Sequence, residues 1–223
     1  MLVADASDRS IETELKQHLD IIKPRFQLKY YRAENLPVLD SLIMLADKIE
    51  TPFAMVTGDD DYIIPKGIDK ACQILRENNN FAGVTGKALL FDTNCFKTNN
   101  YRTQGIKGKN REERIKAFLN NYWSLNFTVL RSEYFSKVFS FSEFKNKYIS
   151  EEIRPSIIIA SLGDIYKIKT PLLIRGTGHE RNIHPPTTLS SLNSLYKLVI
   201  SEFEIKNKNK QREIKILINK LFE

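Results

Sequence analysis

The chain of 223 residues has few cysteines and no apolar run long enough to cross a membrane. Cys72 and Cys95 are its two thiols, and their spacing fits neither a zinc site nor a disulfide framework. Its apolar stretches fall well short of the roughly 20 residues of a membrane-spanning helix. The N-terminus also lacks the basic, apolar and small-residue order of a secretion signal. We therefore expect reduced cysteines and a cytoplasmic protein.

The charge is positive, because 34 Lys and Arg residues outnumber 27 Asp and Glu residues and give +7 at pH 7. Such a charge permits binding to nucleic acid, anionic lipid or a phosphorylated ligand. A nucleic-acid-binding protein or metal-dependent nuclease is disfavoured, since the sequence has no zinc finger, RNP-like strand or basic arm. Much of the excess lies between Lys197 and Lys220. A solvated helix face is the simplest interpretation, and peripheral contact with the inner face of an anionic membrane is the alternative.

Apolar stretches alternate with helical patterns along the first third of the chain. Strands are predicted at Leu2 to Asp5, Gln27 to Tyr31 and Phe53 to Thr57, and helices from about Ser10, from Leu36 to Ile49 and from Pro65. Strand and helix in alternation is the α/β pattern. The third strand is a continuous apolar run, so we expect it to be buried on both faces of a mostly parallel sheet.

The remainder of the chain is less regular. Its predicted elements are a strand region at Gly83 to Phe91, a long loop or excursion from Asp92 to Lys109, a helix capped by Asn110 with Glu113, a strand at Phe127 to Leu130, a helix from Glu151 closed by Gly163, short strands at Tyr166 to Ile168 and Leu172 to Ile174, and amphipathic helices at Leu189 to Phe203 and Arg212 to Phe222. We expect a main domain over residues 1–185 and a helical extension over 186–223. Packing of the extension against the main domain is the default.

An acidic run, Asp59-Asp60-Asp61, follows the third predicted strand. Adjacent carboxylates repel one another and need a positive charge for balance. Their hard oxygen atoms favour Mg²⁺ or Mn²⁺, which often bind together with a substrate phosphate. Acids before a helix are also favoured by capping and by the helix dipole. The run alone therefore leaves the metal and capping interpretations equal.

In their order along the chain, these segments resemble the family-two glycosyltransferases of the GT-A fold. The likeness spans about Leu2 to His184 and rests on Val3 to Ser7, Phe53 to Pro65, Ile149 to Glu152, and Pro171 to Arg175 with His179 after it. It implies a three-layer, Rossmann-like α/β fold with a mixed sheet and helices on both faces. It also implies metal-dependent transfer of a sugar, with inversion, from a nucleotide-sugar, most often a UDP-sugar.

The resemblance assigns roles to particular residues. It implies nucleotide-sugar contacts from Asp5, Ser7, Asp59, Asp60 and Arg175, and Mn²⁺ or Mg²⁺ ligands from Asp59, Asp61 and His179. Asp5 meets the base in this scheme, although an Asp there could equally cap the following helix. For His179 a plain loop position is the stronger alternative. The acceptor implied by the family is a carbohydrate or a lipid-linked molecule in cell-envelope or capsule polysaccharide synthesis.

Glu151 and Glu152 are the predicted catalytic acids, with Glu152 at the position where the family usually has an Asp base. Two acids in a helix's first turn are also favoured by the dipole alone. The family normally begins with a further strand and helix, whereas this chain starts at the second strand. We therefore expect an exposed strand edge and an incomplete donor pocket. The alternative function is a truncated, non-catalytic domain that binds nucleotide or a partner protein only.

Overall fold

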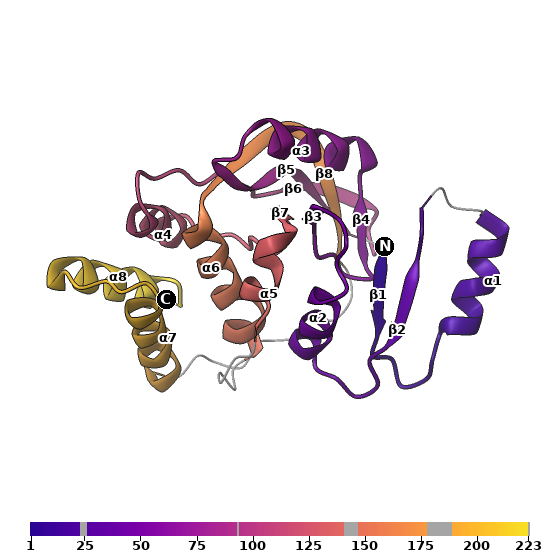
Figure 1. The fold of residues 1–223 in the computed structure, drawn as a ribbon, viewed down its shortest axis with the longest axis horizontal. Coiled ribbons are helices and arrows are strands. Elements are labelled where there is room, and N and C mark those ends of the chain that lie inside the picture. The colour runs from indigo at the N-terminus through magenta and orange to yellow at the C-terminus, as the bar shows by residue number, and fades with distance from the viewer. Residues whose placement is uncertain (23–25, 93, 141–146, 178–188, 223) are drawn as a thin grey trace.

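The computed structural model describes residues 1–22, 26–92, 94–140, 147–177 and 189–222, and Figure 1 shows their arrangement. The strands are β1 (Leu2–Asp5), β2 (Lys29–Arg32), β3 (Phe53–Ala54), β4 (Asp61–Ile63), β5 (Phe81–Asp92), β6 (Lys97–Tyr101), β7 (Val129–Arg131) and β8 (Asp164–Thr177). The α-helices are α1 (Glu12–Ile22), α2 (Val38–Ala46), α3 (Pro65–Glu77), α4 (Arg111–Asn120), α5 (Phe135–Val138), α6 (Arg154–Leu162), α7 (Leu189–Glu202) and α8 (Lys208–Lys220). A 3-10 turn at Ser132–Tyr134 and a π-helical segment at Ile149–Ile153 complete the described elements.

These strands form two separate sheets. In the smaller sheet β1 and β2 run parallel, with Leu2 to Asp5 opposite Lys29 to Arg32. The larger sheet has the order β3-β7-β5-β8-β4, and β6 pairs with β5. The pairing of β5 with β8 is parallel, whereas the other pairings of the larger sheet are antiparallel. The predicted α/β class with a mixed sheet is confirmed. The expectation of a mostly parallel sheet around the third strand is wrong, because β3 pairs antiparallel with β7 and one pairing of the larger sheet is parallel.

Helices cover both faces of the larger sheet, as predicted. On one face Ala71 and Leu75 of α3 pack against Val84 of β5 and Leu173 of β8. The opposite face packs against α4 and α6, and the C-terminal helices contribute to the same core through Val199, Phe203, Ile214 and Ile218. In β7 the successive residues Val129 and Leu130 belong to different clusters, because neighbouring side chains of a strand point to opposite faces. The expected packing of the C-terminal helices against the main domain is confirmed by their residues in this core.

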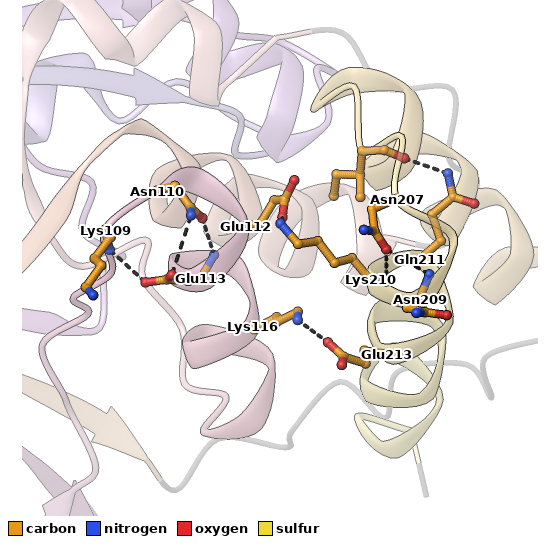
Figure 2. A network of polar contacts seen from close by, with 11 residues as sticks. Lys109, Asn110, Glu112, Glu113, Lys116, Asn207, Asn209, Lys210, Gln211 and Glu213 are labelled. Atoms are coloured by element: carbon orange, nitrogen blue, oxygen red, sulfur yellow. Dashed lines mark hydrogen bonds and ion pairs between the residues drawn. The ribbon is translucent and has the colours of Figure 1, made fainter.

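Polar contacts also join α4 to α8, as Figure 2 shows. Lys116 pairs with Glu213, and Lys210 pairs with Glu112. At the start of α4 the Asn110 side chain accepts a 3.0 Å hydrogen bond from the Glu113 amide, which confirms the predicted cap. Ion pairs thus account for part of the basic charge at the C-terminal end. Among the described residues, no helix combines the length and the apolar character that crossing a membrane requires.

Three predictions of local structure were wrong. Residues Phe53 to Val56 are only half-buried, because β3 is two residues long and pairs along one edge, with β7. The stretch predicted as a loop or excursion contains β6, which forms an antiparallel hairpin with β5. The two late strands are one strand, β8, which continues past Pro171 where its register with β5 shifts near Lys87. Such shifts tolerate a proline, which cannot donate to the ladder.

Candidate functional site

The acidic run lies where the chain enters β4, at one edge of the larger sheet. Antiparallel pairing places Asp61 of β4 directly opposite Arg175 of β8. The next residue of β8, Gly176, donates its amide to the Asp60 carbonyl at 3.1 Å. A Cβ atom at position 176 would lie 2.4 Å from that oxygen, so a side chain there would push the acidic run away from β8. Glycine therefore permits the close approach that sets the acids beside Arg175.

Two of the three aspartates face the same small space. The Gly58 amide donates to Asp61 Oδ2 at 3.3 Å. A Cβ at Gly58 would meet Asp60 Oδ1 at 2.7 Å and Asp61 Oδ2 at 3.4 Å. Asp59 is exposed in the turn. The capping interpretation is wrong, because the N-cap residue of α3 is Ile64 and no side chain caps this helix.

Arg175 is held in a fixed orientation beside Asp61. Its guanidinium carbon lies 5.1 Å from the ring centre of Tyr101 and 4.4 Å from that of Phe127. Its Nη1 donates to the Tyr101 hydroxyl at 3.2 Å, and its Nε is 3.6 Å from Asp61 Oδ1. Burial raises the pKa of Asp61, and the charge of Arg175 opposes that effect. Neither Asp61 Oδ1 nor Arg175 Nε makes a hydrogen bond within the described residues.

The second acidic pair lies in the π-helical segment that leads into α6. Segments of this type are rare and often occur at functional sites. Glu152 Oε1 accepts a short hydrogen bond from the Tyr122 hydroxyl, which in turn accepts one from Tyr148 at 3.2 Å. Burial raises the pKa of Tyr122, and the negative charge of Glu152 raises it further. Tyr122 therefore remains a protonated donor to Glu152 across the physiological range.

Tyr101 connects the two acidic regions. Burial raises the pKa of Tyr101, the positive charge of Arg175 lowers it, and the charges of Glu152 and Asp61 raise it. The Tyr101 ring is therefore within electrostatic reach of acids that are far apart in the sequence. We call Asp61, Tyr101, Tyr122, Tyr148, Glu152 and Arg175 the acid–tyrosine cluster. Sequence reasoning found its charged members but missed its tyrosines, which come from β6, from the loop just after α4 and from the residue before the π-helical segment.

Asp5 lies at the end of β1 and is buried, with 4% of its surface exposed. Its carboxylate accepts hydrogen bonds from the Ser7 amide at 3.0 Å, from the Ile11 amide at 3.1 Å and from the Tyr30 hydroxyl. Arg32 Nη1 lies 3.2 Å from Asp5 Oδ2. Led by the Tyr30 hydrogen bond, these contacts hold the pKa of Asp5 well below its usual range. These hydrogen bonds to the Asp5 carboxylate fix the conformation of the loop that leads into α1.

Comparison with known proteins identifies the fold. No family model matches the sequence, and no curated protein matches it. The structure of residues 1–349 of S. aureus TarS in complex with UDP-GlcNAc has a TM-score of 0.68 at 14% identity, and the match covers 99% of this chain and 63% of that one. TarS is a glycosyltransferase of the GT-A type. The present chain has a GT-A-type glycosyltransferase fold.

Two further TarS structures match this GT-A fold. Residues 1–349 without the ligand give a TM-score of 0.64 at 12% identity, over 98% of this chain and 60% of that one. A longer TarS chain gives 0.61 at 12% identity, over 100% of this chain and 38% of that one. The chain therefore spans less than two thirds of the length of each of these three TarS chains.

Within this GT-A fold the predicted site residues fall into three groups. Asp60, Asp61, Arg175 and Glu152 lie in or beside the acid–tyrosine cluster, and Glu151 precedes Glu152 in the π-helical segment, where its carbonyl accepts from Asn126 Nδ2 at 2.8 Å. Asp5 and Ser7 lie in the smaller sheet and the loop after it. His179 lies outside the described residues. The catalytic, nucleotide-binding and metal-binding roles of all these residues, and of Asp59, stay predictions.

Proposed function

We propose that the chain binds a nucleoside diphosphate sugar, of which a UDP-sugar is the best candidate, and transfers the sugar to an acceptor hydroxyl. The observation that supports this most is the acid–tyrosine cluster. It brings Asp61, at the edge of β4, into one cluster with Glu152, in a fold that TarS shares and in which TarS was solved with UDP-GlcNAc. The acceptor is a carbohydrate or a lipid-linked molecule of the cell envelope or capsule.

The carboxylates of the acidic run are suited to bind a divalent cation together with a phosphate of the nucleotide-sugar. Asp60 Oδ1 and Asp61 Oδ2 approach the same point above Gly58, and Asp61 Oδ1 is buried without a hydrogen bond in the described part of the chain. One or two carboxylates plus substrate phosphates are a usual set for Mg²⁺ and serve Mn²⁺ as well. Asp60 and Asp61 would hold the ion. When bound, it would act as a Lewis acid and stabilise the charge that develops on the leaving diphosphate. Among the described residues, no three His, Cys, Asp or Glu side chains group as metal ligands.

Arg175 is suited to orient the diphosphate. The rings of Tyr101 and Phe127 and the ion pair with Asp61 hold the guanidinium in one orientation. Even so, 31% of the Arg175 side chain is exposed to solvent. A guanidinium forks onto phosphate oxygens with two parallel hydrogen bonds. Since the aromatic rings already fix its orientation, little further ordering is needed on binding.

Glu152 is the proposed general base. Tyr122 occupies Glu152 Oε1, so Oε2 is the oxygen that takes the proton from the acceptor hydroxyl. The deprotonated hydroxyl then forms its bond to the anomeric carbon while the bond to the diphosphate oxygen breaks. Attack from the side opposite the leaving group inverts the configuration at that carbon. The tyrosines around Glu152 orient it and exclude water.

The test measures ligand binding and donor cleavage separately. UDP-GlcNAc with Mn²⁺ should raise the Tm, because a ligand selective for the folded state stabilises it. Asp61→Asn should abolish the Mn²⁺-dependent part of the shift, whereas Asp69→Asn on the exposed face of α3 should not. Glu152→Gln should keep the shift and slow hydrolysis of UDP-GlcNAc by about a hundredfold or more. Failure of UDP and UDP-GlcNAc, with or without Mn²⁺, to change the Tm would refute donor binding.

A second candidate is a non-catalytic domain that binds only nucleotide or a protein partner. It is favoured by one observation: β1 and β2 form a sheet of their own, separate from the larger sheet that contains β3. A Tm shift with UDP, combined with donor hydrolysis that Glu152→Gln leaves unchanged, would support this candidate and contradict the transferase.

A further inference from the structure

The segment that carries the proposed base departs from a regular α-helix. In the π-helical segment Ile149–Ile153 the Arg154 amide donates to the Ile149 carbonyl, five residues back. Pro155 follows in the first turn of α6. A proline has no amide hydrogen, and in a helix its ring clashes with the carbonyl four residues before it, which here belongs to Glu151. The Glu151 carbonyl therefore cannot receive the hydrogen bond that a regular α-helix would provide from residue 155.

A side chain from another part of the chain donates to this carbonyl. Asn126 lies in the loop of residues 121–128, which leads from α4 to β7 (Figure 1), and its Nδ2 donates to the Glu151 carbonyl at 2.8 Å. The Asn126 Oδ1 is buried and makes no hydrogen bond within the described residues. A buried amide oxygen without a partner costs free energy, so an asparagine is a poor choice for packing alone. The hydrogen bond to Glu151 is what an apolar side chain of the same size could not provide.

Further contacts attach the same loop to both parts of the proposed site. The Leu125 amide donates to Ser156 Oγ at 3.0 Å, at the start of α6. The centre of the Phe127 ring lies 4.4 Å from the guanidinium carbon of Arg175. Tyr122, at the beginning of the loop, donates to the proposed base. One loop thus contacts the segment that carries the base and the arginine proposed for the diphosphate.

From these contacts we infer that Asn126 is a positioning residue for Glu152 and acts through the backbone of the π-helical segment. The inference rests on the proposed function, in which Glu152 is the base. The Glu151 carbonyl belongs to the planar peptide unit that ends at the Cα atom of Glu152. A hydrogen bond that holds this carbonyl therefore fixes the direction in which the Glu152 side chain leaves the backbone. A general base works only within hydrogen-bond reach of its proton, so a small rotation of this unit slows the reaction.

The first test replaces Asn126 by a side chain of similar size that cannot donate. Asn126→Leu should speed hydrogen exchange of the Arg154 amide by about tenfold, because the π-helical segment loses an anchor. It should lower kcat for UDP-GlcNAc hydrolysis by about tenfold or more and change KM by less than about twofold. The Tm shift with UDP-GlcNAc and Mn²⁺ should be retained, since the affinity for the donor does not depend on the base. Asn120→Leu, at the exposed end of α4, is the matched control and should change none of these quantities.

The second test changes the proline that shapes the segment. Pro155→Ala restores an amide hydrogen, which can donate to the Glu151 carbonyl and compete with Asn126. This variant should also lower kcat with little change in KM, because a regular helical turn would point Glu152 elsewhere. Adding Asn126→Leu to Pro155→Ala should then have little further effect, since both changes act on the same carbonyl. Fully additive losses of kcat would contradict a shared mechanism and overturn the inference.

The outcomes distinguish failure of this inference from failure of the proposed function. If Glu152→Gln slows hydrolysis but Asn126→Leu leaves either kcat or the exchange of the Arg154 amide unchanged, Asn126 is not a positioning residue and the transferase proposal stands. Loss of the donor-induced Tm shift in Asn126→Leu would mean a general folding or binding defect and would also overturn the inference. A wild-type chain that neither binds nor hydrolyses UDP-GlcNAc would refute the proposed function, and the positioning of a base with it.

Discussion

Helices α1 and α3 both follow a strand of the first third of the chain, yet they differ in how they are held. In α3, Ala71 and Leu75 are completely buried between β5 and β8. In α1, Leu15 and Leu19 are only half-buried, and 78% of Ile21 is exposed. The larger sheet therefore has a core on both faces, whereas the unit formed by β1, α1 and β2 has little core of its own.

This difference separates the two ends of the proposed donor site. Asp60, Asp61 and Arg175 are built on β4 and β8, inside the well-packed part of the molecule. Asp5 and Ser7 belong to the smaller sheet and the loop after it. Local stability follows the density of buried apolar contacts. The part of the proposed site built on β4 and β8 is thus the more rigid part, and the region around Asp5 depends on contacts within its own loop.

The largest expected effect comes from truncating one leucine in each helix. Leu75→Ala removes a fully buried side chain and should lower the free energy of unfolding by about 2–5 kcal/mol. Leu15→Ala removes a half-buried one and should lower it by less than about 1 kcal/mol. Urea unfolding followed by circular dichroism measures both. Equal losses of free energy would mean that α1 is packed as tightly as α3 and would contradict the proposed difference between the two helices.

Lowering the pH should destabilise the smaller sheet before the larger one, with a smaller effect than the leucine truncations. The pKa of Asp5 is depressed in the folded state, so its stabilisation is complete above the usual value of about 3.9 and is lost as the pH falls below it. Hydrogen exchange should therefore show β1 and β2 losing protection before β5 and β8 as the pH falls from about 5. Asp5→Asn should reduce protection of β1 about tenfold at neutral pH and remove this pH dependence. Asp8→Asn is the exposed control, and loss of protection in all four strands together would contradict the prediction.

The sequence was most informative where local chemistry decides the structure. Pro65 opens α3 and Asn110 caps α4 as predicted, because both effects depend on residues within one turn. The β6 hairpin was missed because the strand Lys97 to Tyr101 is mostly exposed and has no apolar alternation. The continuity of β8 was missed because Pro171 is normally a sign that a strand ends.

Only the charged residues of the candidate site could be predicted from the sequence. Asp61, Arg175 and Glu152 could be found because they are charged residues next to predicted strands and helices of an α/β pattern. Tyr101 and Tyr122 could not, since only the pairing of β6 with β5, the neighbour of β8, and the packing of α4 beside α6 bring them to those charges. The pairing of Asp61 with Arg175 likewise depends on the register of β4 with β8, which no local pattern specifies.

The smallest expected effect concerns the C-terminal helices, which resemble α3 rather than α1 in their burial. Ile214 and Ile218 of α8 are fully buried in the main core, whereas the pair of Lys116 with Glu213 lies near the surface. A double-mutant cycle with Lys116→Met and Glu213→Gln should therefore give a coupling of only about 0.2–1 kcal/mol, which salt should weaken further. Urea unfolding at low and high salt measures it. A coupling well above this range, insensitive to salt, would mean that charge rather than apolar burial holds α8, and that the C-terminal helices are anchored differently from α3.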